Sequence, residues 1–289
     1  MTFNFPVFGH TGKGHIIIVQ RAMDQLTTNE QDYFNGMSKL LLTQLSSKEG
    51  SPDSKKHKHN SPTSLISRFP DDYKRLELKA LFMQFGVQLP KSLTPYQNKT
   101  TSNWHYMNIP LDGTCRYNSN NISKFIPISI KAFKESIALK DKALMLSFIV
   151  HLVGDIHQPL HTHNRYNNRC IHDLGGNNYC LTIDNELPKK CAQSLHSLWD
   201  KSVGWLSEGK SVREHIMQLN RLTSPAQINS PISHWISENK NAAAFAYSTP
   251  RYKTPKKKYY FQGQAIMRER SIAASDRLAL LLKGLYRGR

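Results

Sequence analysis

The segment His151-Leu-Val-Gly-Asp155-Ile-His-Gln-Pro159-Leu-His161 contains three histidines and one aspartate within a short run of sequence. Residues four apart in an α-helix are separated by about 40° around its axis, so His151 and Asp155 are expected to point to one side. A proline pushes the residue before it out of the α region, so Pro159 predicts the end of this helix. We expect a turn before Pro159 that brings His161 back towards the same face.

The spacing of apolar residues predicts helices through most of the chain. One segment, Asn178–Asp184, alternates as a strand does, and with the residues before Cys191 it predicts one small β-hairpin. Composition predicts exposed loops at Ser46–Pro62, a Lys- and His-rich insertion, and at Tyr247–Lys258. Because no internal repeat or linker is visible, we expect a mainly α fold with one compact helical domain over residues 10–289. The expected helices are His15–Leu26, Gln31–Leu45, Tyr73–Gln84, Ser123–Ile137, Asp141–Val153, Ser211–Leu222, Pro231–Ala246 and Gly263–Leu285.

The charge of the chain predicts a polyanionic partner. Its 289 residues include 39 Lys and Arg against 21 Asp and Glu, a formal net charge of +18. Such a field makes nucleic acid the first partner to test, and an anionic membrane surface would be attracted by the same charge. The longest apolar runs, Ile16–Val19 and Leu278–Leu282, are far shorter than the roughly 18 residues of a membrane-spanning helix, so we expect no stable membrane insertion.

The four cysteines favour disulfides over a thiolate metal site. None follows the Cys-x-x-Cys spacing of thiolate zinc sites, and an even number indicates an oxidising compartment. We therefore expect a secreted or periplasmic protein. Cys180 and Cys191 flank the expected hairpin and could meet across it, which would leave Cys115 to pair with Cys170. This is one of three arrangements that four cysteines allow.

The first residues of the chain bear on metal binding, because a free N-terminal amine can be a metal ligand. Met1–Gly9 has neither the basic nor the apolar region of a signal peptide. Val7 and Gly9 do stand at the two positions that a signal peptidase reads. We therefore expect the active chain to begin at or near His10.

A second His-x-x-x-Asp pair, His196 and Asp200, repeats the pattern of His151 and Asp155. One such pair is commonly a surface ion pair, but two pairs with His161 favour a metal site. Imidazole and carboxylate together suit zinc and similar divalent ions without any thiolate. His157 lies about 240° around the helix from His151, which predicts a structural role for it.

These motifs closely resemble the zinc-dependent type I nucleases, a family that includes mung bean nuclease. The resemblance rests on the His151–His161 segment, on Gly175-Gly176-Asn177, and on Leu195-His196-Ser-Leu-Trp-Asp200. It extends from His15 to the C-terminus and implies the phospholipase C/nuclease fold with a trinuclear zinc cleft. Further matching pieces are Gly14-His15, Phe69-Pro-Asp71-Asp-Tyr-Lys74, Trp104-His105-Tyr106 and Arg277-Leu-Ala279.

The resemblance also implies a ligand set for three zinc ions. Its first zinc would be held by Asp71, His105, His151 and Asp155. Asp155 would bridge to a second zinc, which His15 and the N-terminal residue complete. In this chain that residue would be His10, with its amine, carbonyl and imidazole as donors. The third zinc would be held by His161, His196 and Asp200.

The implied chemistry is hydrolysis of phosphodiester bonds by a zinc-activated water. By resemblance, the enzyme would be an endonuclease on single-stranded DNA and RNA that leaves 5′-phosphate products, and 3′-nucleotidase activity on nucleotides is compatible with it. Asp71 would orient the water, Lys74 would lie beside the scissile phosphate, and Asn177 would bind substrate. Tyr106 is a candidate platform for an unpaired base. Surface lysine and core packing are the alternative interpretations of Lys74 and Tyr106.

Two other functions remain open from the sequence. The zinc-dependent phospholipase C family shares the fold and the ligand order, but its last ligand pair is His-x-x-x-Glu where this chain has His196 and Asp200. A non-enzymatic, basic nucleic-acid-binding module with a structural metal is the third hypothesis. The open coordination implied by eight side chains around three metals favours catalysis over a structural role.

We expect the protein to be a monomer.

Overall fold

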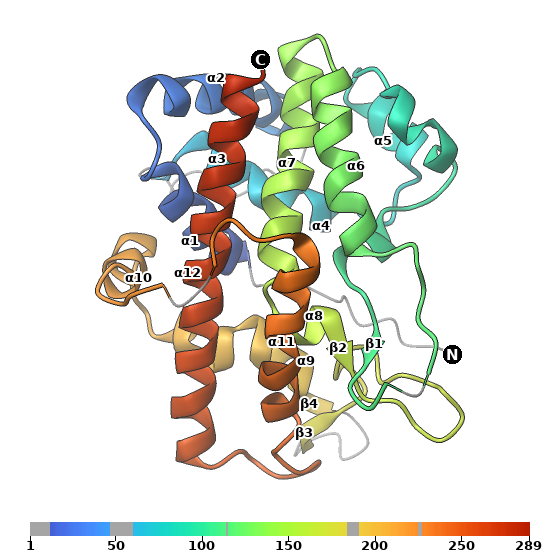
Figure 1. Cartoon of the computed structure of the whole chain (residues 1–289), viewed down its shortest axis with the longest axis vertical. Helices are drawn as coiled ribbons and strands as arrows, with labels where there is room; N and C mark the ends of the chain where they lie inside the picture. The colour runs from blue at the N-terminus through green and yellow to red at the C-terminus, as the bar shows by residue number, and fades with distance from the viewer. Residues whose placement is uncertain (1–11, 47–59, 114, 184–190, 225–226) are drawn as a thin grey trace.

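Helix α7 (Leu139–Asp155) runs through the centre of a computed structural model that describes residues 12–46, 60–113, 115–183, 191–224 and 227–289 (Figure 1). Every side chain from Ala143 to Asp155 is buried. A helix that is apolar on all sides must be covered on all sides, and α7 contacts α1, α2, α6 and α12. The other helices are α1 (Gly12–Met23), α2 (Thr28–Ser46), α3 (Pro62–Leu65), α4 (Phe69–Tyr73), α5 (Leu78–Gln84), α6 (Ile122–Glu135), α8 (Pro159–Thr162), α9 (Leu195–Asp200), α10 (Val212–Leu219), α11 (Ile232–Ala246) and α12 (Lys257–Arg287), with the 3₁₀ helices η1 (Ile66–Arg68), η2 (Lys91–Tyr96), η3 (Ser102–His105) and η4 (Ser202–Ser207).

The mainly α prediction is confirmed, and most expected helices are present with shifted ends. Helix α12 begins at Lys257, six residues before the expected Gly263, so the end of the predicted loop Tyr247–Lys258 is helical. Of the predicted insertion Ser46–Pro62, residues 47–59 lie outside the described part of the chain, and Pro62 already begins α3.

The single helix predicted over Tyr73–Gln84 is wrong. Helix α4 ends at Tyr73 and α5 begins at Leu78. Between them Glu77 is extended, with ψ of 143°, and forms an isolated bridge with Thr100. The Leu78 amide donates to the carbonyl of Lys99 at 2.9 Å. These bonds to residues 97–100 replace the intrahelical bonds that a continuous helix would make, although the apolar spacing alone favours one.

Two small sheets complete the described fold. Strands β3 (Cys180–Ile183) and β4 (Cys191–Ser194) pair antiparallel, so the predicted hairpin is present. Its second strand begins at Cys191 instead of preceding it, and residues 184–190 lie outside the described part. Strands β1 (Ile109–Pro110) and β2 (His163–Asn164) form a parallel pair that the sequence did not predict.

Both predicted disulfides are confirmed. Cys180 bonds to Cys191 across the hairpin, and Cys115 bonds to Cys170. Among the described residues, no helix combines the length and the apolar content that a membrane crossing requires.

Candidate metal centre

The centre is built on the last turn of α7. His151 and Asp155 are fully buried, and His151 Nε2 lies 2.9 Å from Asp155 Oδ2. The predicted i, i+4 geometry therefore places imidazole and carboxylate together on one face.

His105 reaches this pair from the segment that leads into β1. Its Nδ1 lies 2.9 Å from His151 Nε2 and 3.0 Å from Asp155 Oδ2. The pairing of β1 with β2 positions this segment, and the Met107 amide donates to the carbonyl of His161 at 2.6 Å. The unpredicted parallel pair thus holds the chain around His105 against the chain around His161.

Asp71 and His15 extend the same cluster. Asp71, on α4, places Oδ1 3.7 Å from His105 Nδ1 and 3.9 Å from His151 Nε2. His15, on α1, places Nε2 3.4 Å from Asp155 Oδ1. Asp155 is therefore the carboxylate that lies between His15 on one side and His105 and His151 on the other.

A neighbouring group consists of His161, His196 and Asp200. Nε2 of His161 lies 3.6 Å from Asp200 Oδ1, and Nε2 of His196 lies 3.3 Å from Asp200 Oδ2. The two imidazoles stack with ring centroids 5.1 Å apart. His161 Nδ1 also lies 3.5 Å from Asp155 Oδ1, so the two groups adjoin.

Backbone carbonyls orient three of these rings. Nδ1 of His151 donates to the carbonyl of Ser67 at 2.7 Å, and Nδ1 of His161 donates to the carbonyl of His105 at 2.8 Å. Nδ1 of His196 donates to the carbonyl of Gly175 at 2.8 Å. In each ring this bond directs Nε2 into the cluster as an acceptor, which is how proteins commonly orient metal-binding histidines.

Two further residues support the cluster, of which the sequence reasoning missed the role of Gln158 and singled out Gly175. Gln158 is fully buried and donates from Nε2 to Asp200 Oδ1 at 2.8 Å, which fixes that carboxylate. Gly175, at φ +64°, approaches so closely that a Cβ there would lie 2.6 Å from the carbonyl oxygen of Leu160. The Gln-Pro step was the signal that could have identified Gln158, and the Gly-Gly pair did indicate the close backbone approach at Gly175.

The buried carboxylates of the cluster are stabilised by positive charge beside them. Burial would raise the pKa of the Asp155 carboxyl, but His151 and His161 beside it hold that pKa well below its usual range. Burial would lower the pKa of His161, but Asp155 and Asp200 raise it to about 9. Burial lowers the pKa of His196. Without a cation the carboxylates would hold protons on neighbouring imidazoles, and a divalent metal would displace those protons.

The residues fit a zinc cluster. The buried Nε2 atoms of His161 and His196, and Oδ1 of Asp155, make no hydrogen bond within the described part of the chain. Three sets each bring their ligand atoms within 4.8 Å of one another: His15, Asp71 and His151; His105, His151 and Asp155; His161, His196 and Asp200. Neutral imidazole and carboxylate are the ligands zinc accepts at such open sites. All eight predicted side chains that the structure describes come together here, and His10 lies outside the described residues.

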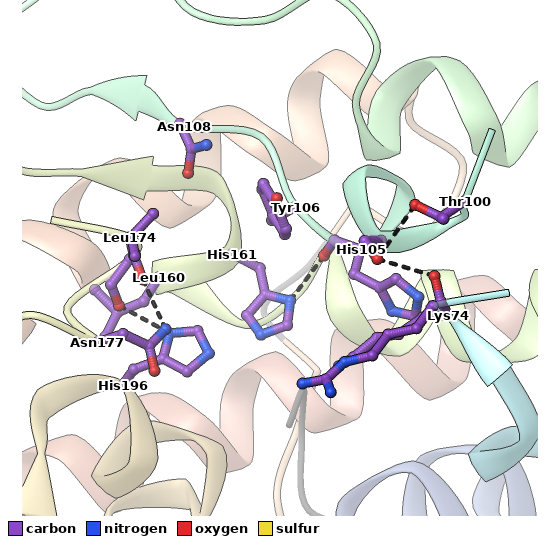
Figure 2. Close-up of a pocket in the computed structure, with 13 residues that line it drawn as sticks. Lys74, Thr100, His105, Tyr106, Asn108, Leu160, His161, Leu174, Asn177 and His196 are labelled. Atoms are coloured by element: carbon purple, nitrogen blue, oxygen red, sulfur yellow. Dashed lines mark hydrogen bonds between the residues drawn. The ribbon is translucent and has the colours of Figure 1, made fainter. Parts of the chain in front are cut away.

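A pocket of about 390 Å³ opens at this cluster, and the other predicted site residues line it. Figure 2 shows His161 between His105 and His196, with Tyr106 and Asn177 nearby. Tyr106 donates its hydroxyl to Asn103 Oδ1 at 2.8 Å, and Asn177 donates to the carbonyl of Leu174 at 2.7 Å. Further lining residues that the sequence reasoning did not identify are Arg75, Thr100, Ser102 and Asn108.

Lys74 lies at the border of the pocket with its Nζ 2.9 Å from Asp71 Oδ1. The break between α4 and α5 follows directly after it, so Lys74 ends a helix beside the cluster. A cation in this position can meet a phosphate oxygen and also neutralise part of the carboxylate charge.

His157 faces away from the cluster, as its helical angle predicts. Its Nδ1 donates to the carbonyl of Val153 at 2.7 Å, and Arg277 donates to its Nε2 at 2.9 Å. Burial, with the Arg277 charge beside it, lowers the pKa of His157 to about 3. The neutral ring therefore serves as a hydrogen-bond acceptor between α7 and α12.

Comparison with known proteins identifies the family. Residues 10–287 match the S1/P1 nuclease family. One relative, nuclease S1 of Aspergillus oryzae (strain ATCC 42149 / RIB 40), is 40% identical over 58 residues, which are 20% of this chain and 16% of the relative. The match to that protein thus spans about a sixth of its length, whereas the family match includes all eight His and Asp residues of the candidate metal centre. The chain belongs to the S1/P1 nuclease family.

Proposed function

We propose that the chain is a zinc-dependent endonuclease that hydrolyses phosphodiester bonds of single-stranded DNA and RNA to 5′-phosphate products. The observation that carries the proposal is the junction of a 390 Å³ pocket with eight buried or nearly buried His and Asp side chains. We further propose that three zinc ions are the cofactor. When bound, zinc supplies a Lewis acid that activates water and stabilises negative charge on phosphoryl oxygens.

The chain's own residues would bind and position the substrate. Lys74 would neutralise a phosphate oxygen at the pocket border, where Asp71 holds its ammonium. Tyr106 would stack an unpaired base, and Asn177 would hydrogen-bond to it or orient a ligand. A paired base cannot leave its stack without cost, which favours single strands. We propose 3′-nucleotidase activity as a secondary reaction of the same site, because a terminal phosphate would occupy the same position.

We also propose that the protein acts outside the cytoplasm as one domain over residues 10–289. The two disulfides support this location, because such bonds persist in oxidising compartments.

The test compares zinc-loaded protein on a single-stranded oligonucleotide, the matching duplex, and phosphatidylcholine vesicles, with the product ends identified by mass spectrometry. We expect 5′-phosphate products, with kcat/KM on the single strand at least about tenfold higher than on the duplex. The variant His161→Gln is the control for contaminating nuclease. Hydrolysis of phosphatidylcholine without cleavage of either nucleic acid would overturn the proposal in favour of a phospholipase.

A further inference from the structure

A second concave surface lies between α1 and α10, on elements that the pocket at the metal cluster does not use. We call it the α1–α10 groove; Lys13, Ile16, Arg68, Lys210, Arg213 and Ile216 are among its lining residues. Building on the proposed nuclease function, we propose that this groove binds the phosphate backbone of a single-stranded polynucleotide whose scissile bond lies at the metal cluster.

The charge of the groove suits a polyanion. Its lining includes four cations and one carboxylate, Asp24. Neither Arg68 nor Arg213 forms an ion pair with a carboxylate in the described part of the chain, whereas Lys210 pairs with Glu208 at 2.5 Å. Arg68 acts at longer range on Asp72, where its charge opposes the rise in pKa that burial gives that carboxyl. Guanidinium groups on a concave surface are the usual ligands of phosphate oxygens.

The groove is rigidly built at the Lys13 side. Lys13 Nζ donates to the carbonyls of Leu206 at 3.0 Å and Lys210 at 2.6 Å, which ties α1 to the loop before α10. Ser211 and Glu214 form a capping box that fixes the start of α10. The backbone at positions 210 and 213, which carries two of the cations, is therefore held beside α1.

The groove also adjoins the metal cluster. Arg68 packs against Gly12 in the first turn of α1. Gly12 precedes His15 by three residues on α1, and Arg68 precedes Asp71 by three residues of helical backbone. Because residues three apart share a helix face, both ligands lie one turn from the groove wall. The pocket at the cluster and the groove share no lining residue, so the proposed strand would pass from one to the other over the surface between them.

The dimensions favour an extended ligand. The groove has a volume of about 1130 Å³, above the usual 300–1,000 Å³ of pockets for one small molecule. Met217, which is 50% exposed, gives the groove an accessible apolar surface above buried Ile216. A single strand presents both apolar base faces and phosphates, whereas a duplex conceals the base faces.

The experiment measures binding of a fluorescently labelled, phosphorothioate-linked 20-nucleotide single strand across a series of salt concentrations. The variant Arg68→Gln/Arg213→Gln is compared with Lys131→Gln/Lys134→Gln, which removes the same charge from exposed positions of α6. Loss of two phosphate contacts should weaken binding and lower the slope of log K against log salt by about 1.4. The control variant should keep the parent slope, and kcat/KM on a dinucleotide should stay within about twofold in both variants.

The results separate the groove from the active site. Equal slopes of log K against log salt in the two variants would overturn the groove proposal. Equal losses of binding to a duplex and to a single strand in Arg68→Gln/Arg213→Gln would overturn it too. A parent protein that cleaves neither the dinucleotide nor a single-stranded oligonucleotide would overturn the proposed function, while the binding slopes would still decide the groove. If Arg68→Gln/Arg213→Gln does not fold, because Arg68 packs on Gly12, Arg213→Gln alone should lower the slope by about 0.7.

Discussion

The imidazole of His15 on α1 stacks on the imidazole of His151 on α7, with ring centroids 4.0 Å apart and ring planes inclined by 18°. The stack joins two helices whose candidate metal-binding residues are far apart in the sequence. It is possible because Gly154 in α7 has no side chain: a Cβ there would lie 2.7 Å from His15 Nδ1. The glycine of the His-Leu-Val-Gly-Asp motif therefore makes room for His15 in the candidate metal centre.

Gly154→Ala should displace His15 and lower the zinc content of the protein. We expect loss of about one zinc ion per chain and a fall in kcat of roughly a hundredfold, because the ligand moves but the other seven side chains remain. Metal analysis of purified protein tests this. The matched control is Gly36→Ala on α2, where no atom lies within 4 Å of the new Cβ; it should raise the free energy of unfolding by about 0.5–1 kcal/mol. Full zinc content in Gly154→Ala would contradict the packing argument.

Gln158→Leu should weaken the group of His161, His196 and Asp200 selectively. The substitution removes the 2.8 Å hydrogen bond that holds Asp200, so we expect zinc affinity at this site to fall about 10–100-fold. Competition with a chelator measures that affinity. The exposed α12 variant Gln262→Leu should match the parent protein. Unchanged release of all zinc ions would mean that Asp200 needs no orienting partner.

Asp155→Asn should abolish most activity, because Asp155 contacts both parts of the cluster. We expect turnover to fall by a factor on the order of a thousand, with the fold retained by circular dichroism. Asparagine keeps the shape of the side chain but not its charge. Retained activity would reduce Asp155 to an ion-pair residue.

Glu238 makes stability depend on acid pH, away from the metal ligands. Burial alone would raise its pKa, but hydrogen bonds and charges of Arg277 and Arg270 lower it to about 2. A depressed pKa contributes stability that is present above the usual value of 4.5 and is lost as pH falls towards 2.

Glu238→Gln should therefore reduce stability at neutral pH, by about 2 kcal/mol, since buried Arg277 loses its charged partner. The loss of stability between pH 4.5 and 2 should be shallower than in the parent protein. Urea unfolding at several pH values measures both effects. The exposed Glu269→Gln on α12 is the control. If the free energy of unfolding falls equally between pH 4.5 and 2 in all three proteins, Glu238 is not the group responsible.

Local periodicity was sufficient to predict the helix that carries His151, and the i, i+4 spacing placed Asp155 beside it. Helix α9, which carries His196, was not among the helices expected from periodicity, and the repeated His-x-x-x-Asp spacing alone identified His196 and Asp200. The resemblance then brought in Asp71 and His105, whose proximity depends on packing between distant segments. The break after Lys74 was not predictable from apolar spacing, since it depends on hydrogen bonds to residues 97–100.

The supporting residues were harder to identify for a related reason. The parallel pairing of Ile109 with His163 involves only two residues per strand, too few to give an alternating pattern. Gln158 lies among candidate metal-binding histidines and aspartates, and nothing in its sequence position predicts its contact with Asp200, 42 residues later in the chain. His10, which the resemblance proposes as a ligand, stays a prediction.

The most direct test of the account is the number of zinc ions per chain in active protein, measured by mass spectrometry under native conditions and by elemental analysis. The three ligand sets, two of which share His151, predict close to three zinc ions per chain. Removal by a strong chelator should abolish phosphodiester hydrolysis, with recovery on adding zinc. Fully active protein that contains one zinc ion or none would contradict the account.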